Sequence, residues 1–79
     1  MPTVLRIGLY RFHFYSRESN EPPPIHVARD DLEVKFWLNP ISVAVNFGFA
    51  ATEVDDIRRL VEEHCDFLIE ADHRFHGNR

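Results

Sequence analysis

The hydrophobic pattern of this chain changes its period once, near residue 50, and that change constrains the fold more than any other feature. Before it, short segments alternate apolar and polar residues with a period of two, which is typical of strands with one buried face. After it, apolar residues recur every three to four positions, the period of an amphipathic helix. A run of strands followed by a helix predicts an α+β fold, in which an antiparallel sheet carries the helix on one face.

Five segments show the strand pattern, and the residues between them favour turns. Gly8-Leu9 and Asp30-Asp31 can each close a tight hairpin. The segment 16–24 is polar and ends in three prolines, which have no backbone N–H and cannot lie inside a sheet. We therefore expect an antiparallel sheet of four to five strands, at about residues 3–7, 10–15, 25–29, 32–38 and 41–47.

One long C-terminal helix is predicted over about residues 52–75. Its apolar stripe includes His64, which we expect to hydrogen-bond to the sheet. A single helix covers one face of a sheet, and the strand residues expected beneath it are Tyr10, Phe12, Phe14, Phe36 and Val43. The opposite face is then left uncovered, and the residues expected on it are Arg11, His13, Tyr15, His26, Glu33, Lys35 and Trp37.

Length and composition indicate one small domain over residues 1–79. A chain of this size buries only about 60% of the surface that its unfolded form exposes, so its core is small. The single cysteine, Cys65, allows no intrachain disulfide, and we predict no signal peptide and no membrane span. We therefore expect a cytoplasmic protein. The net charge of -4 argues against direct binding of nucleic acid.

Two histidines and a tyrosine on the uncovered face are candidate catalytic residues: His13, His26 and Tyr15. Together with Arg11 or Lys35 they could perform metal-independent acid–base chemistry on a phosphodiester, because histidine exchanges protons near neutral pH. The simpler interpretation is that they are the polar side chains that the solvent side of any half-buried strand needs. The simpler interpretation is the one we favour.

The end of the predicted helix carries a second pattern of candidate ligands, Glu70, His73 and His76. Glu-x-x-His holds metal ions in helical bundles, but there several helices supply the ligands, and only one helix is predicted here. The cysteine pairs of structural zinc sites are absent from the sequence. We therefore interpret these residues as a solvated helix end and expect no cofactor.

The uncovered face also has the composition of an interface. Tyrosine, tryptophan and arginine are enriched where proteins bind one another. The candidate interface residues are Arg11, Tyr15, His26, Lys35 and Trp37. A domain with a small core and such a face is a candidate for a homodimer or for a complex with another protein.

Several segments of the chain, in order and spacing, resemble the small bacterial proteins of the domain of unknown function family 4160. The resemblance covers nearly the whole chain and rests on Met1–Gly8, Phe12–Val27, Ala28–Pro40, Gly48-Phe49 and Leu60–His73. It implies a protein encoded beside another short reading frame, as in toxin–antitoxin-like two-gene modules. The first hypothesis is therefore an interaction subunit of such a module, whose partner is a co-encoded small protein. The alternatives are a ribonuclease-like toxin that uses His13, His26 and Tyr15, and a small metal- or ligand-binding module.

The chain departs from the family pattern in two places. Where the family reads Pro-His-Ile-His-Val, this chain reads Pro24-Ile25-His26-Val27, so that only the second histidine is kept. Where the family reads Glu-x-Trp-His, the segment Glu70-Ala71-Asp72-His73 has no tryptophan. A site built on the paired histidines of that motif would be impaired here, whereas a structural motif would tolerate the change.

Overall fold

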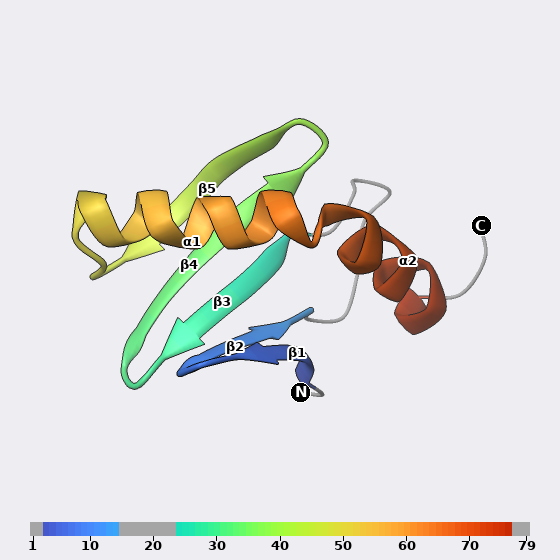
Figure 1. Ribbon diagram of the computed structural model, residues 1–79, viewed down its shortest axis with the longest axis horizontal. Coiled ribbons are helices and arrows are strands. Elements are labelled where there is room, and N and C mark those ends of the chain that lie inside the picture. The colour runs from blue at the N-terminus through green and yellow to red at the C-terminus, as the bar shows by residue number, and fades with distance from the viewer. Residues whose placement is uncertain (1–2, 15–23, 77–79) are drawn as a thin grey trace.

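The computed structural model describes residues 3–14 and 24–76, which form a five-stranded sheet and two helices (Figure 1). The sheet pairs in chain order and is antiparallel throughout, so each strand lies beside the one that precedes it. The predicted α+β fold is confirmed. The strands are β1 (Thr3–Ile7), β2 (Tyr10–His13), β3 (Ile25–Arg29), β4 (Leu32–Leu38) and β5 (Ile41–Phe47).

Two tight turns fix the register of the first and third strand pairs. Gly8 joins β1 to β2 with a φ of 57°, and Asp30 joins β3 to β4 with a φ of 56°. This left-handed backbone conformation is open to glycine and is tolerated by aspartate better than by most residues. Both predicted hairpins are therefore present, and their registers decide which side chains share a face.

The core lies between one face of the sheet and the helices. Phe12, Phe14 and Phe36 are fully buried in it, as predicted, and Tyr10 packs against its margin. Val43 is the cross-strand partner of Phe36 and so lies on the predicted face, but its side chain is 37% exposed at the edge of the sheet. The helix residues that meet the sheet in the core are Val54, Ile57, Val61 and Leu68.

Where the sequence predicts one helix over residues 52–75, the structure has two, α1 (Ala51–Glu63) and α2 (Cys65–His76). The break is at His64, whose φ of -111° and ψ of 18° leave the helical region. Its Nδ1 lies 2.9 Å from the carbonyl oxygen of Leu60, which can only accept, so the ring donates within its own helix and not to the sheet as predicted. Figure 1 shows α2 turning away from the axis of α1.

A bulge in β5 changes which of its side chains face the helices. Lys35 pairs with Val45 but the next residue, Phe36, pairs with Val43, so Ala44 is an extra residue in β5. Because strand side chains alternate, the extra residue moves the second half of β5 to the opposite face. The residues moved to the face away from the helices are Val45 and Phe47.

A polar cluster ties the start of α1 to the sheet. The Glu53 carboxylate accepts hydrogen bonds from Nε and Nη2 of Arg29, both at 2.9 Å, and from the Tyr10 hydroxyl at 2.7 Å. The guanidinium of Arg29 also lies 5.5 Å from the ring centre of Phe49. Such a two-pronged, charge-assisted contact fixes orientation as well as distance, and it positions α1 across the sheet.

Candidate functional site

The face of the sheet that points away from the helices, which we call the open face, collects most of the predicted site residues. Cross-strand partners point to the same side of a sheet, so the register assigns them. Tyr15 lies outside the described residues. The described residues of the open face include Arg6, Arg11, His13, His26, Ala28, Glu33, Lys35, Trp37, Val45 and Phe47.

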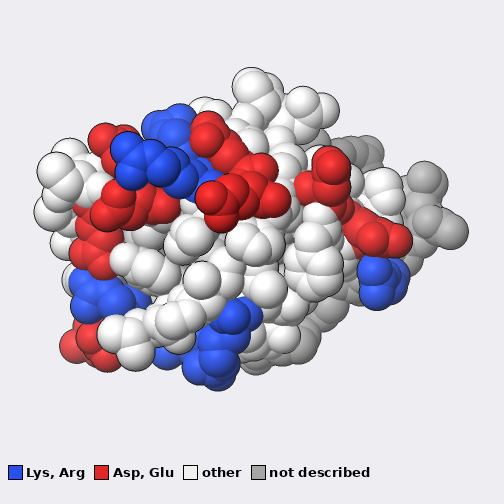
Figure 2. All heavy atoms as spheres, in the orientation of Figure 1, with Lys and Arg blue, Asp and Glu red and all other residues white. Residues whose placement is uncertain are grey.

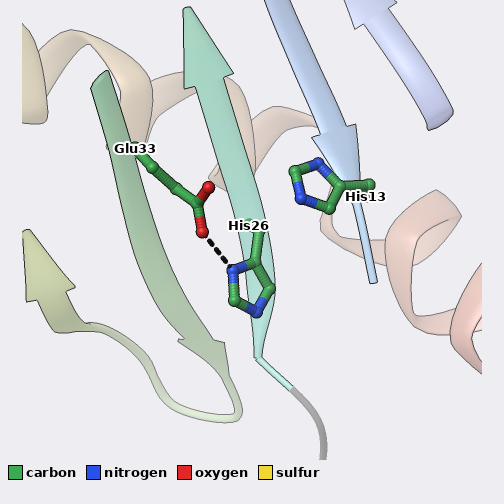
Figure 3. Close-up of side chains that lie close together, drawn as sticks. All are labelled: His13, His26 and Glu33. Carbon is green, nitrogen blue, oxygen red and sulfur yellow. Dashed lines mark hydrogen bonds and ion pairs between the residues drawn. The ribbon is translucent and has the colours of Figure 1, made fainter. Parts of the chain in front are cut away.

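Three of these side chains, from three neighbouring strands, come together on the open face (Figure 3). His13 and His26 are cross-strand partners, and their rings stack with centroids 5.3 Å apart and planes 21° from parallel. Nδ1 of His26 lies 2.7 Å from Oε2 of Glu33. One possible ligand atom from each of the three residues lies within 4.8 Å of the other two. Two histidines and a carboxylate thus form one compact cluster, which we call the His–His–Glu cluster.

The hairpin between β3 and β4 explains how Glu33 reaches the histidines. The turn at Asp30-Asp31 sets Ala28 opposite Glu33 and His26 opposite Lys35. Glu33 therefore lies diagonally from His26, within reach of a long side chain. The strand alternation places Glu33 on this face, but sequence reasoning did not join it to the histidines; the two-residue turn was the signal that could have done so.

Burial lowers the pKa of both histidines in the cluster. His26 is only 6% exposed, and burial lowers its pKa below the ordinary histidine value, although the hydrogen bond with Glu33 acts in the opposite direction. Burial, and then the charge of His26, lower the pKa of His13. Both rings are therefore neutral at neutral pH, the form that accepts a proton or binds a metal ion.

The stacking of the two rings bears on the predicted acid–base chemistry. In-line displacement at a phosphodiester needs groups on opposite sides of the phosphorus. Parallel rings with centroids 5.3 Å apart leave no room for a phosphate between them. The histidine pair is better suited to hold one ligand at a shared edge than to flank a substrate.

The predicted ligands at the helix end behave as solvated residues where the structure describes them. Glu70 and His73 are exposed on α2, and Glu70 forms an ion pair with Arg74 at 3.3 Å. The side chain of His76 lies outside the described part of the chain. Burial raises the pKa of the Cys65 thiol, which keeps it protonated and disfavours a role as nucleophile.

Charge is divided between the two sides of the molecule. Among the described residues, the open face carries the cations Arg6, Arg11 and Lys35 and a single acid, Glu33. Figure 2 shows acidic side chains gathered over the helix side. The acids on the helices are Glu53, Asp55, Asp56, Glu62, Glu63, Asp66, Glu70 and Asp72, against the cations Arg58, Arg59 and Arg74. Neither helix in the described chain is long and apolar enough to cross a membrane.

β5 forms one edge of the sheet, and no described strand pairs with its outer side. The strand Ile41–Phe47 holds no charged residue and no proline, two features that commonly protect edge strands from pairing with other chains. Its bulge gives some protection. Three of its exposed side chains are apolar, with Val43 37%, Val45 36% and Phe47 57% exposed, and Asn46 between them is exposed and polar. Trp37 on neighbouring β4 is 36% exposed.

Comparison with known proteins identifies a family for which no activity is described. The family model of a domain of unknown function, DUF4160, matches residues 10–71. No curated protein and no solved structure matches the chain. The matched range includes the whole His–His–Glu cluster and the edge strand β5.

Proposed function

The chain belongs to the DUF4160 family, and we propose that it is a protein-interaction subunit that accepts a strand from an acidic partner protein along the outer edge of β5. The observation that carries this proposal is the uncharged, proline-free edge strand Ile41–Phe47 with its exposed apolar side chains. Backbone N–H and C=O groups along such an edge bind an extended segment of another chain by adding it to the sheet. The family resemblance favours a partner encoded beside this protein.

Side chains next to the edge would give such a complex its specificity. A strand added to β5 alternates its side chains between the two faces of the sheet. On the open face they would lie beside Val45 and Phe47, and on the helix side beside Val43. Burial of these partly exposed apolar groups would add to the backbone hydrogen bonds.

Charge favours an acidic partner over a second copy of this chain. Lys35 on β4 is the cross-strand partner of Val45, so only β5 separates it from the added segment. A second copy would offer β5 itself, which has no acid, and would bring another cationic open face. A partner strand with aspartate or glutamate on this side would complement Lys35.

The test is to co-express the untagged protein with the products of its adjacent genes and to measure molar mass by light scattering after size exclusion. We expect a stoichiometric complex with an acidic protein. Val45→Lys, which places a charge on the edge strand, should weaken the complex at least about tenfold. Leu9→Lys is the matched control, because Leu9 is 73% exposed in the turn between β1 and β2, and it should leave the affinity unchanged.

Three outcomes would contradict the proposal. The chain could purify alone from the co-expression, or the complex could survive Val45→Lys undiminished. The chain could also form a homodimer that Val45→Lys dissociates, which would assign β5 to a second copy.

A further inference from the structure

The His–His–Glu cluster is composed of metal-binding residue types, and nothing in the proposed strand addition requires it. We propose that His13, His26 and Glu33 bind one divalent first-row transition-metal ion, for which zinc is the probe. The site lies on the sheet, whereas sequence reasoning placed its metal candidates at the helix end and expected no cofactor. It goes beyond the proposed interaction function and stands on a separate observation.

The distances in the cluster come close to those of a metal site. Zinc binds imidazole nitrogen at about 2.0–2.1 Å and carboxylate oxygen at about 2.0–2.2 Å, so tetrahedral ligand atoms lie roughly 3.4 Å apart. The three candidate atoms already lie within 4.8 Å of one another. Nδ1 of His26 and Oε2 of Glu33, at 2.7 Å, would move slightly apart, and His13 would move slightly closer. Side-chain rotations supply changes of this size without moving the strands.

The type of ligand selects the class of ion. Two imidazole nitrogens and one carboxylate oxygen suit zinc, nickel, cobalt or copper, whereas calcium and magnesium prefer sites built of oxygen alone. Structural zinc sites have four protein ligands, while three protein ligands with one further position are typical of sites that bind water or a ligand. Among the described residues the cluster offers three ligands, which makes it of the second kind.

The scaffold holds two of the three ligands firmly. The histidines project from neighbouring strands β2 and β3 and stack on each other, and His26 is only 6% exposed. In the metal-free protein, His26 and Glu33 are joined by a hydrogen bond. A metal ion that enters between Nδ1 and Oε2 takes the place of the proton between them; because the His26 ring is neutral, that proton moves to Nε2 and the imidazole stays neutral.

Nearby positive charge opposes the binding of a cation and gives the proposal a distinctive signature. Lys35 is the cross-strand partner of His26 and repels positive charge there. An ion must therefore be held by its coordinate bonds and not by the general field of the open face. Replacing Lys35 with the neutral glutamine should tighten binding at this site, whereas it has no reason to affect an ion held at the helix end.

The experiment is a zinc titration of the full, untagged, chelator-stripped protein by calorimetry against a competing chelator. Cobalt absorption in the visible range reports the coordination geometry. We expect one equivalent of zinc, and at least about a 100-fold loss of affinity for His13→Ala and for Glu33→Gln, more than the loss of an outer-shell contact costs. Lys35→Gln should raise the affinity several-fold, and His73→Ala, on exposed α2, should leave it unchanged.

Thermal melts with and without zinc separate ligand loss from misfolding. Zinc should raise the melting temperature of the wild-type protein by mass action and should leave that of a folded His13→Ala variant unmoved. The proposal is overturned if the wild-type protein takes up no stoichiometric zinc. It is equally overturned if His13→Ala and Glu33→Gln bind zinc as the wild type does, or if His73→Ala abolishes binding.

Discussion

At the scale of single residues, aromatic side chains form the core, and the polar cluster of Arg29, Glu53 and Tyr10 attaches α1 to the sheet. Phe12, Phe14 and Phe36 are fully buried, and no solvent reaches their rings. The strand alternation identified all three correctly, because a period of two leaves each residue only two faces to choose from. Contacts between long polar side chains, such as Arg29 with Glu53, were not predicted, because they depend on how the helix lies across the sheet.

Truncation of one core ring should nearly unfold the protein. Phe36→Ala removes a fully buried phenyl group and should lower the free energy of unfolding by about 3–5 kcal/mol. A 79-residue domain has roughly 4–12 kcal/mol in total. Urea unfolding followed by circular dichroism measures the loss. Phe67→Ala, at a ring that is 41% exposed on α2, is the control and should cost much less; equal losses would mean that the core is elsewhere.

The carboxylate at the start of α1 should make stability depend on pH in the acid range. The hydrogen bonds from Arg29 and then Tyr10 hold the pKa of Glu53 below its ordinary value. The unfolded chain therefore binds a proton at a higher pH than the folded chain. The stability that the contact supplies is present above the ordinary pKa and is lost as the pH falls through the lowered one.

Glu53→Gln tests this dependence. The variant should be less stable than the wild type at pH 7, and the difference should shrink as the pH is lowered below about 4.5. Thermal melts across that range measure it. Glu62→Gln, at an exposed glutamate of the same helix, controls for the loss of one acid. A constant difference between Glu53→Gln and the wild type at every pH would contradict the account.

At the scale of elements, the turns were predictable and the irregularities were not. Gly8 and Asp30 mark hairpins because few other residues tolerate a left-handed backbone. The break at His64 interrupts the helix for one residue, too short to disturb the apolar period by which the helix was predicted. The bulge at Ala44 left the sequence alternation intact while reversing the faces of Val45 and Phe47.

The connection between β5 and α1 depends on one side chain. Nδ2 of Asn46 donates to the carbonyl oxygen of Phe49 at 2.8 Å, and its Oδ1 accepts from the Phe49 N–H at 3.0 Å. α1 has no side-chain cap at Ala50, so these bonds hold the chain as it enters the helix. Asn46→Ala should cost about 1–3 kcal/mol for the two bonds, and Asn46→Asp, which keeps only the acceptor, should cost less. Urea unfolding measures the stability of each variant. An Asn46→Ala variant as stable as the wild type would contradict the role of Asn46 in holding the entry to α1.

At the scale of the whole molecule, the two sides of the sheet carry different chemistry. The helices supply the excess of acid, while the open face carries cations, the His–His–Glu cluster and the apolar margin along β5. The composition gives only the net charge of -4, which does not reveal how acids and cations are divided between the two sides. That the described helices lie on only one side of the sheet was predictable, because a single layer of helix covers one side of a sheet. His13 and His26 were placed together on that face, but Glu33 was not joined to them, because its position beside His26 depends on the register of the β3–β4 hairpin.

The central claim, that β5 is the edge which receives a partner strand, is tested most directly by amide hydrogen exchange followed by mass spectrometry. The protein is compared alone and in the complex obtained by co-expression. The account predicts slower exchange in Ile41–Phe47 on complex formation, with the opposite edge strand, β1, unchanged. Protection confined to β1 or to the helices, with β5 exchanging as in the free chain, would contradict it.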